Sequence, residues 1–105
     1  MADEIYTLLT VKVKSESSGK RQELFDWLKN NKYGVEFTKS FGGCISIEGR
    51  MATDDDVTIV VWQKWCSQAH FEAYKKERRE TNTGFRQWKD DIESFHTMFL
   101  SKESF

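Results

Sequence analysis

Two histidines are the side chains of this chain best suited to move a proton near neutral pH. His96 lies in a C-terminal segment of alternating residues and shares one face of it with Met98 and Leu100. That placement fits either a satisfied core or interface histidine or a catalytic base. His70 falls in the first turn of an expected helix, where it is either exposed or an acid or base at the mouth of a pocket.

The other reactive residue types lack the spacing of a metal or cofactor site. Asp54 to Asp56 are three successive acids without the spacing and closing Glu of a calcium loop, which favours a solvated turn. Cys44 and Cys66 have no neighbouring ligands at zinc spacing. Cys66 precedes an expected helix, where a thiolate would be stabilised, and a buried structural thiol is the alternative. The sequence therefore predicts neither a metal nor a cofactor.

Aromatic residues make up 14% of the chain, including four Trp and eight Phe. They either fill the core of a small domain or line a cavity for a flat, apolar ligand. The second interpretation makes the aromatic residues candidates for binding rather than only for packing.

Length and charge exclude several classes of partner. The 105 residues are expected to form one domain, spanning 1–105. With 16 basic and 17 acidic residues the net charge is −1, so neither nucleic acid nor an anionic membrane is expected. No apolar run approaches the roughly 20 residues that cross a bilayer. The acidic N-terminus lacks a signal-peptide pattern, and two unpaired thiols favour a cytoplasmic protein.

Hydrophobic periodicity predicts an α+β domain in the order β-α-β-β-α-β. Strands are expected at 5–14, 44–51, 57–65 and 94–102, and helical segments at 19–31, 35–41, 68–80 and 85–92. This order is the ferredoxin-like arrangement, a four-stranded antiparallel sheet with helices on one face.

The strand at 57–65 is apolar on both faces. Ile59 and Val61 point to one face, and Val60 and Trp62 point to the other. A sheet covered by helices on one side only would leave the second set in water, which is costly for a stripe of this size. We therefore expect the open sheet face to pack against a second copy of the chain, giving a homodimer.

Three short motifs carry a resemblance to a known family. They are Gly42-Gly43-Cys44 at the start of a strand, the Trp65-Cys66-Ser67 junction, and the helix start SQAHFEAY at 67–74. Over nearly its whole length the chain resembles the antibiotic biosynthesis monooxygenase-like domains of the dimeric α+β barrel superfamily. The resemblance implies a dimeric barrel, and it specifies fold better than function because one scaffold hosts many activities.

Well-understood members of that family are similar to cofactor-independent oxygenases of phenolic polyketides, in which the deprotonated substrate itself activates oxygen. Their polar set is an Asn four residues before a strand-ending Trp, that Trp, an aromatic hydroxyl six residues after it, and an Arg. Trp65 matches, but Val61 and Phe71 occupy the Asn and hydroxyl positions. The resemblance therefore implies Tyr74 as the hydroxyl, and Arg78 or Arg86 as the cation.

The leading hypothesis is a cofactor-independent monooxygenase-like enzyme that acts on an aromatic or phenolic small molecule. Its pocket is expected between the sheet and the helices. The expected walls are Trp65, Phe71, Tyr74, Trp88 and Phe41, and the expected catalytic groups are His96, Tyr74 and Arg86. The alternative is a non-catalytic dimeric module that binds a small apolar ligand or only assembles, which the missing Asn and Tyr favour.

Overall fold

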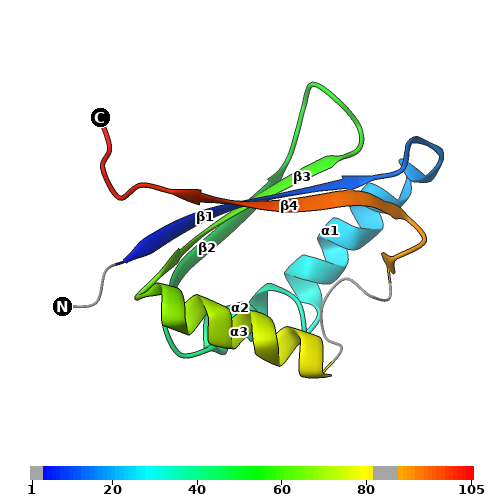
Figure 1. The fold of residues 1–105 in the computed structure, drawn as a ribbon. Coiled ribbons are helices and arrows are strands. Elements are labelled where there is room, and N and C mark those ends of the chain that lie inside the picture. The colour runs from blue at the N-terminus through cyan, green and yellow to red at the C-terminus, as the bar shows by residue number, and fades with distance from the viewer. Residues whose placement is uncertain (1–3, 82–87) are drawn as a thin grey trace.

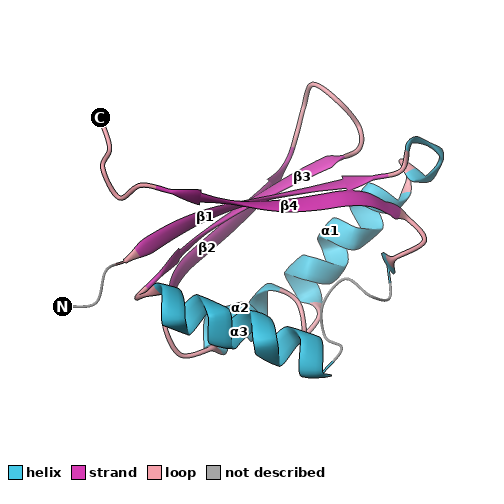
Figure 2. Cartoon of the chain, in the orientation of Figure 1, coloured by secondary structure: helices cyan, strands magenta, loops and turns pink. Residues whose placement is uncertain are grey.

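The computed structural model describes residues 4–81 and 88–105, in which four strands form one antiparallel sheet in the order β2-β3-β1-β4. The strands are β1 (Ile5–Val13), β2 (Cys44–Met51), β3 (Thr58–Trp65) and β4 (Ile92–Leu100). The helices are η1 (Ser15–Ser17), α1 (Lys20–Asn30), α2 (Val35–Ser40) and α3 (Gln68–Thr81). Figure 1 shows α1, α2 and α3 on the same side of the sheet, and Figure 2 separates the two layers by colour. The predicted ferredoxin-like α+β fold is confirmed.

The end of the predicted C-terminal helix and both ends of the predicted last strand are wrong. Residues 85–92 were expected to form a helix that ends at Ile92, whereas Ile92 begins β4, and the strand expected at 94–102 spans Ile92–Leu100. Ile92 pairs with Val13 of β1, and the Lys14 backbone N–H donates to the Asp91 carbonyl at 2.8 Å. Pairing with β1 therefore overrides the helical spacing of the apolar residues at this point. Residues 85–87 of the expected helix lie outside the described residues.

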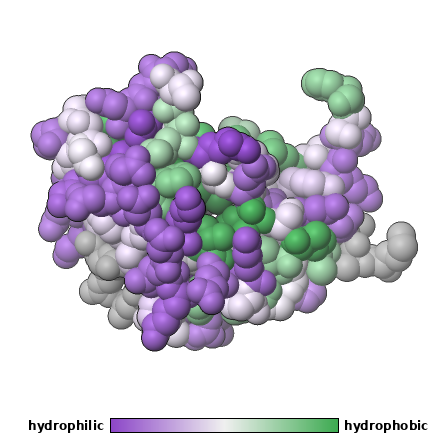
Figure 3. Space-filling view, turned by 180° about the vertical axis from the view of Figure 1, so that it is seen from behind, coloured by the Kyte–Doolittle hydropathy of each residue, from purple (hydrophilic) through white to green (hydrophobic). Residues whose placement is uncertain are grey.

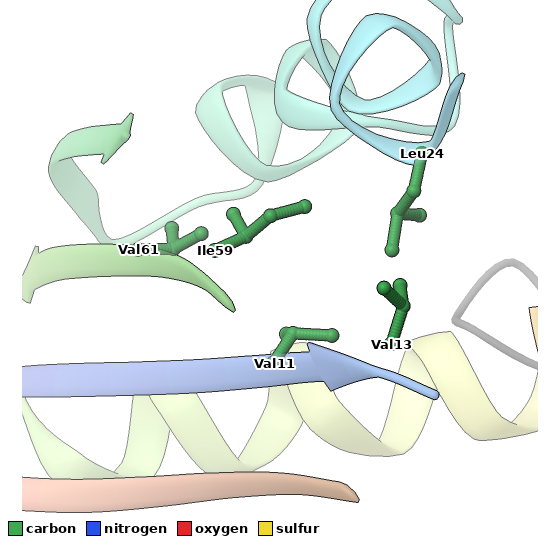
Figure 4. Close-up of a cluster of buried hydrophobic side chains, with 5 residues drawn as sticks. All are labelled: Val11, Val13, Leu24, Ile59 and Val61. Atoms are coloured by element: carbon green, nitrogen blue, oxygen red, sulfur yellow. The ribbon is translucent and has the colours of Figure 1, made fainter. Parts of the chain in front are cut away.

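The first part of the core joins α1 to the middle of the sheet. Val11 and Val13 of β1, Ile59 and Val61 of β3 and Leu24 of α1 are all buried. Figure 4 shows Leu24 directed from α1 toward Val13 on the strand below it. Alternation places Lys12, between the two valines, in solvent, so burial of one apolar face explains why this segment forms a strand.

The second part of the core is aromatic and joins α2 and α3 to the end of β3. Trp65, Phe71 and Tyr74 are buried together, and Phe41 packs against them. The ring centroids of Trp65 and Tyr74 lie 4.9 Å apart, and those of Phe41 and Tyr74 lie 5.6 Å apart in an edge-on arrangement. Aromatic packing of this kind fixes the position of α3 over the sheet.

The other face of the sheet carries no helix among the described residues, and it retains large apolar side chains (Figure 1). Trp62, Met98 and Leu100 are 39%, 48% and 42% exposed. Leu8 pairs with Trp62 on one side and with Met98 on the other, so Trp62, Leu8 and Met98 form a row across the sheet. Hereafter this surface is called the open face.

Apolar surface is also gathered elsewhere on the molecule. Figure 3, which views the chain from behind, shows hydrophobic residues near the middle of that side with hydrophilic residues around them. A single chain of this size therefore leaves part of its apolar surface uncovered, as small domains commonly do.

Asp55 organises the β2–β3 turn. Its carboxylate accepts hydrogen bonds from the Val57 and Thr58 backbone N–H groups at 3.0 and 2.9 Å and from the Thr58 hydroxyl at 2.7 Å. Arg21 of α1 approaches the same carboxylate at 3.8 Å and donates to the carbonyl of Ala52. The Thr58 hydroxyl, then the two backbone donors, hold the pKa of Asp55 below its ordinary value, with a smaller contribution from Arg21.

Asp55→Asn should lower the urea midpoint at pH 7, because it removes the charge that these donors stabilise. A depressed folded-state pKa contributes stability above the unfolded pKa, and that contribution is lost as pH falls through the folded pKa. The difference in urea midpoint between Asp55→Asn and the parent should therefore become smaller below about pH 4. Asp56→Asn, an exposed change one residue away, is the matched control. A destabilisation that is the same at all pH values would contradict this account of the turn.

Candidate functional site

A cavity of about 790 Å³ lies between the inner face of the sheet and the helices. Thr7 and Leu9 of β1 and Val61 and Gln63 of β3 form part of its floor, and α1, α2 and α3 contribute its walls. The volume is within the range of sites that enclose small organic ligands. The floor combines apolar residues with two buried polar side chains, Thr7 and Gln63.

Two buried hydroxyls and a partly buried guanidinium form a cluster at one wall of the cavity. The hydroxyl oxygens of Thr38 in α2 and Tyr74 in α3 are 2.7 Å apart. Arg78 Nε donates to Tyr74 OH at 2.9 Å, and Arg78 Nη2 donates to Thr38 Oγ1 at 3.0 Å. Thr38 is 2% exposed and Tyr74 is 9% exposed. The guanidinium therefore orients both hydroxyls in a site from which most water is excluded.

Arg78 also ties α3 to the turn between α1 and α2. Its Nη2 donates to the Gly34 carbonyl at 2.9 Å, and its Nη1 donates to the Tyr33 carbonyl. The guanidinium carbon lies 4.4 Å from the ring centroid of Phe37. The turn itself needs glycine at position 34, because a Cβ there would meet the Leu28 carbonyl oxygen at 2.3 Å.

Gln63 is a second polar element on the cavity floor, and it is hydrogen-bonded to Trp65 beneath it. Both side chains point from β3 toward the helices, and Trp65 is fully buried. Trp65 Nε1 donates to Gln63 Oε1 at 2.7 Å. The indole N–H is therefore already engaged within the protein, and it is Gln63 rather than Trp65 that lines the cavity.

The structure places the predicted aromatic wall residues in two layers. Phe71 and Tyr74 line the cavity. Trp65 and Phe41 pack behind Tyr74. Trp88 packs edge-on against Trp27, a lining residue, with ring centroids 6.4 Å apart. In the described part of the chain the buried Trp88 Nε1 has no hydrogen-bond acceptor.

Tyr74 and His96, two of the predicted catalytic residues, lie on opposite sides of the sheet. Tyr74 lines the cavity. His96 pairs with Thr10 on the open face, on the opposite side of the sheet from the cavity. Arg86 lies outside the described residues, and Arg78, the other cation considered, occupies the cavity wall.

His70, the second histidine, lies in the first turn of α3, where it contacts Ser67. Its Nδ1 lies 2.7 Å from the Ser67 hydroxyl, and its backbone N–H donates to the same oxygen at 3.3 Å. Gly43 has a φ of 100°, and a Cβ at that position would meet the His70 ring at 2.4 Å. Gly43, the second glycine of the pair noted in the sequence, therefore permits both a left-handed turn and close contact with α3.

Neither thiol is part of a disulfide, and both are partly buried. Burial raises the pKa of the Cys44 thiol, while Lys39 opposes the shift and Cys66 adds to it.

The described residues contain no group of three or more metal-binding side chains. None of the helices in 4–81 and 88–105 is long and apolar enough to span a bilayer.

Sequence reasoning missed Gln63 and Thr38. An amide at an inward position of an otherwise apolar strand was an available signal for Gln63. Thr38 gives no such signal, because its partner Tyr74 lies 36 residues away along the chain.

The fold has solved counterparts, although no protein-family profile and no curated protein match the chain. A Shewanella oneidensis protein is 19% identical with a TM-score of 0.76, covering 95% of this chain and 91% of its own. SnoaB, a cofactor-independent oxygenase from Streptomyces nogalater, is 12% identical with a TM-score of 0.74, covering 99% and 97%. An antibiotic biosynthesis monooxygenase is 13% identical with a TM-score of 0.73, covering 95% and 99%.

The chain has the antibiotic biosynthesis monooxygenase-like fold. Within that fold, the polar groups that line the cavity of this chain include Gln63 and the cluster of Thr38, Tyr74 and Arg78.

Arg78→Lys should destabilise the protein by about 1–3 kcal/mol, because an ammonium cannot reproduce the planar set of donors to Tyr74, Thr38 and the Gly34 carbonyl. Urea unfolding followed by tryptophan fluorescence measures the loss. Arg79→Lys, an exposed change on the same helix, should stay within about 0.5 kcal/mol of the parent. Equal stability of the two variants would show that the guanidinium contacts contribute nothing specific.

Proposed function

We propose that this protein is a cofactor-independent monooxygenase-like enzyme that acts on an aromatic or phenolic small molecule in the cavity described above. The observation that carries the proposal is an apolar cavity of small-ligand size whose wall holds two buried hydroxyls oriented by a guanidinium. The similarity of the whole chain to SnoaB, a cofactor-independent oxygenase, supports the choice of reaction class.

In the proposed reaction the substrate supplies all the electrons. A reduced ring carbon bearing two hydrogens loses a proton, and the resulting anion reacts with O₂. One oxygen atom enters the substrate as a carbonyl and the other leaves as water, so the four-electron oxidation of the carbon balances the reduction of O₂. Phe71 and the apolar floor bind the flat ring, while Tyr74 and Arg78 stabilise the negative oxygen that develops.

His96 has no role in this proposal, because it faces away from the cavity.

A second candidate function is a non-catalytic ligand-binding module. It is favoured by Trp65, whose indole N–H is already engaged by Gln63, and by the apolar residues Val61 and Phe71 at positions where oxygenase relatives were expected to carry polar ones.

Oxygen consumption separates the two functions. With an anthrone as substrate and a chelator present, the parent protein should consume O₂, and Tyr74→Phe should reduce the rate by about 100-fold, because a donor to the developing anion is removed. His96→Ala, on the opposite face of the sheet, should retain the parent rate. Thermal stabilisation by the anthrone without O₂ consumption would favour the binding module and contradict the enzyme.

We further propose that the open face packs against a second copy of the chain, in the cytoplasm, where both cysteines remain thiols. The row of Trp62, Leu8 and Met98 supplies a contiguous apolar contact at the centre of the sheet. Burying it would remove from water a surface that a single chain leaves exposed.

Trp62→Glu should convert a dimer into a monomer, because it places a charge at the centre of this contact. Sedimentation velocity at micromolar concentration measures the mass. Lys29→Glu, an exposed change on α1, should leave the dimer intact. A parent protein with the mass of one chain would refute the proposed pairing.

A further inference from the structure

The donor character of Trp65 Nε1 determines which atom of the Gln63 amide faces it. Trp65 Nε1 can only donate a hydrogen bond, so the atom of Gln63 that lies 2.7 Å from it must be the carboxamide oxygen. The Nε2 group, with two N–H donors, occupies the other branch of the planar amide. Gln63 is 7% exposed and lines the cavity.

The protons of Gln63 Nε2 have no acceptor in the described part of the chain. Nε2 is nevertheless not fully enclosed by protein. In residues 4–81 and 88–105 the only polar side-chain atom that is both fully enclosed and without a partner is Trp88 Nε1. A buried amide that keeps contact with a cavity but finds no protein acceptor is a donor held ready for a ligand.

The hydroxyl cluster adds a further donor to the same cavity. Thr38 and Tyr74 have two hydroxyl protons between them, and one of these forms the 2.7 Å hydrogen bond that joins the two oxygens. Both oxygens also accept from Arg78. One hydroxyl proton is therefore left over for a third group, and Tyr74 lines the cavity.

We infer that Gln63 is a specificity-determining residue that binds an acceptor oxygen of the ligand, either an oxyanion or a carbonyl, in preference to a hydroxyl or amine that must donate. The inference rests on the proposed function, in which a flat aromatic molecule occupies the cavity, and it narrows the substrate class to aromatics with an ionised or carbonyl oxygen. Because a hydrogen bond to a charged oxygen is stronger than one to a neutral oxygen, Gln63 favours the ionised form of a phenol.

The test uses 2-naphthol, whose neutral and ionised forms differ in absorption spectrum, with 2-methoxynaphthalene as a ligand that cannot ionise. Bound to the parent protein, 2-naphthol should ionise at a lower pH than in water. Gln63→Met, which keeps the volume but removes the donors, should weaken naphtholate binding by about 10- to 100-fold. It should change binding of 2-methoxynaphthalene by no more than about twofold.

Equal weakening of both naphthalenes in Gln63→Met would overturn the inference, since that is the result of a purely structural role for Gln63 beside Trp65. Should Gln63→Met not fold, Gln63→Glu gives the same readout, because a carboxyl next to the ligand oxygen must raise the pH at which bound naphthol ionises. Unchanged ionisation in that variant would also overturn it. Absence of saturable binding of either naphthalene to the parent would overturn the aromatic cavity of the proposed function, and this inference with it.

Discussion

The hydrogen bonds of Arg78 are the interaction on which the cavity depends. One guanidinium joins α3 to the turn before α2 through the Gly34 carbonyl, and it joins the two helices directly through Thr38 and Tyr74. A guanidinium presents five N–H donors in one rigid plane, so it fixes these three acceptors relative to one another, whereas the three donors of an ammonium have a different and freely rotating geometry. The wall of the cavity and the orientation of its hydroxyls therefore have a common origin.

The sheet divides the molecule into two surfaces with different roles. Its inner face carries the packed core, the aromatic cluster around Trp65, and a cavity between them. Its open face carries the row around Trp62, which no described helix covers. Strict alternation along β3 produces both surfaces from one segment, since successive side chains point to opposite sides. Ligand binding and assembly are thus proposed for opposite faces of the same four strands.

Local patterns were sufficient to predict the fold but not the site. The alternation in 44–51 predicted β2 with the bounds that the structure has, and the order of strands and long helices along the chain was predicted as β-α-β-β-α-β. Ile92 was misassigned because its partner Val13 lies far away in the chain, and spacing alone cannot register that pairing. Likewise, His96 was correctly grouped with Met98 and Leu100, but only the position of the helices decides which sheet face borders the cavity.

A flat aromatic molecule is proposed to bind between the sheet and the helices. Methyl NMR of the full chain titrated with 2-methoxynaphthalene locates the bound ring, because methyl groups lie on both faces of the sheet. Saturable shift changes are expected at Leu9, Ile47 and Val61, which line the cavity. Shift changes confined to Leu8 and Val60, which belong to the open face, would contradict it.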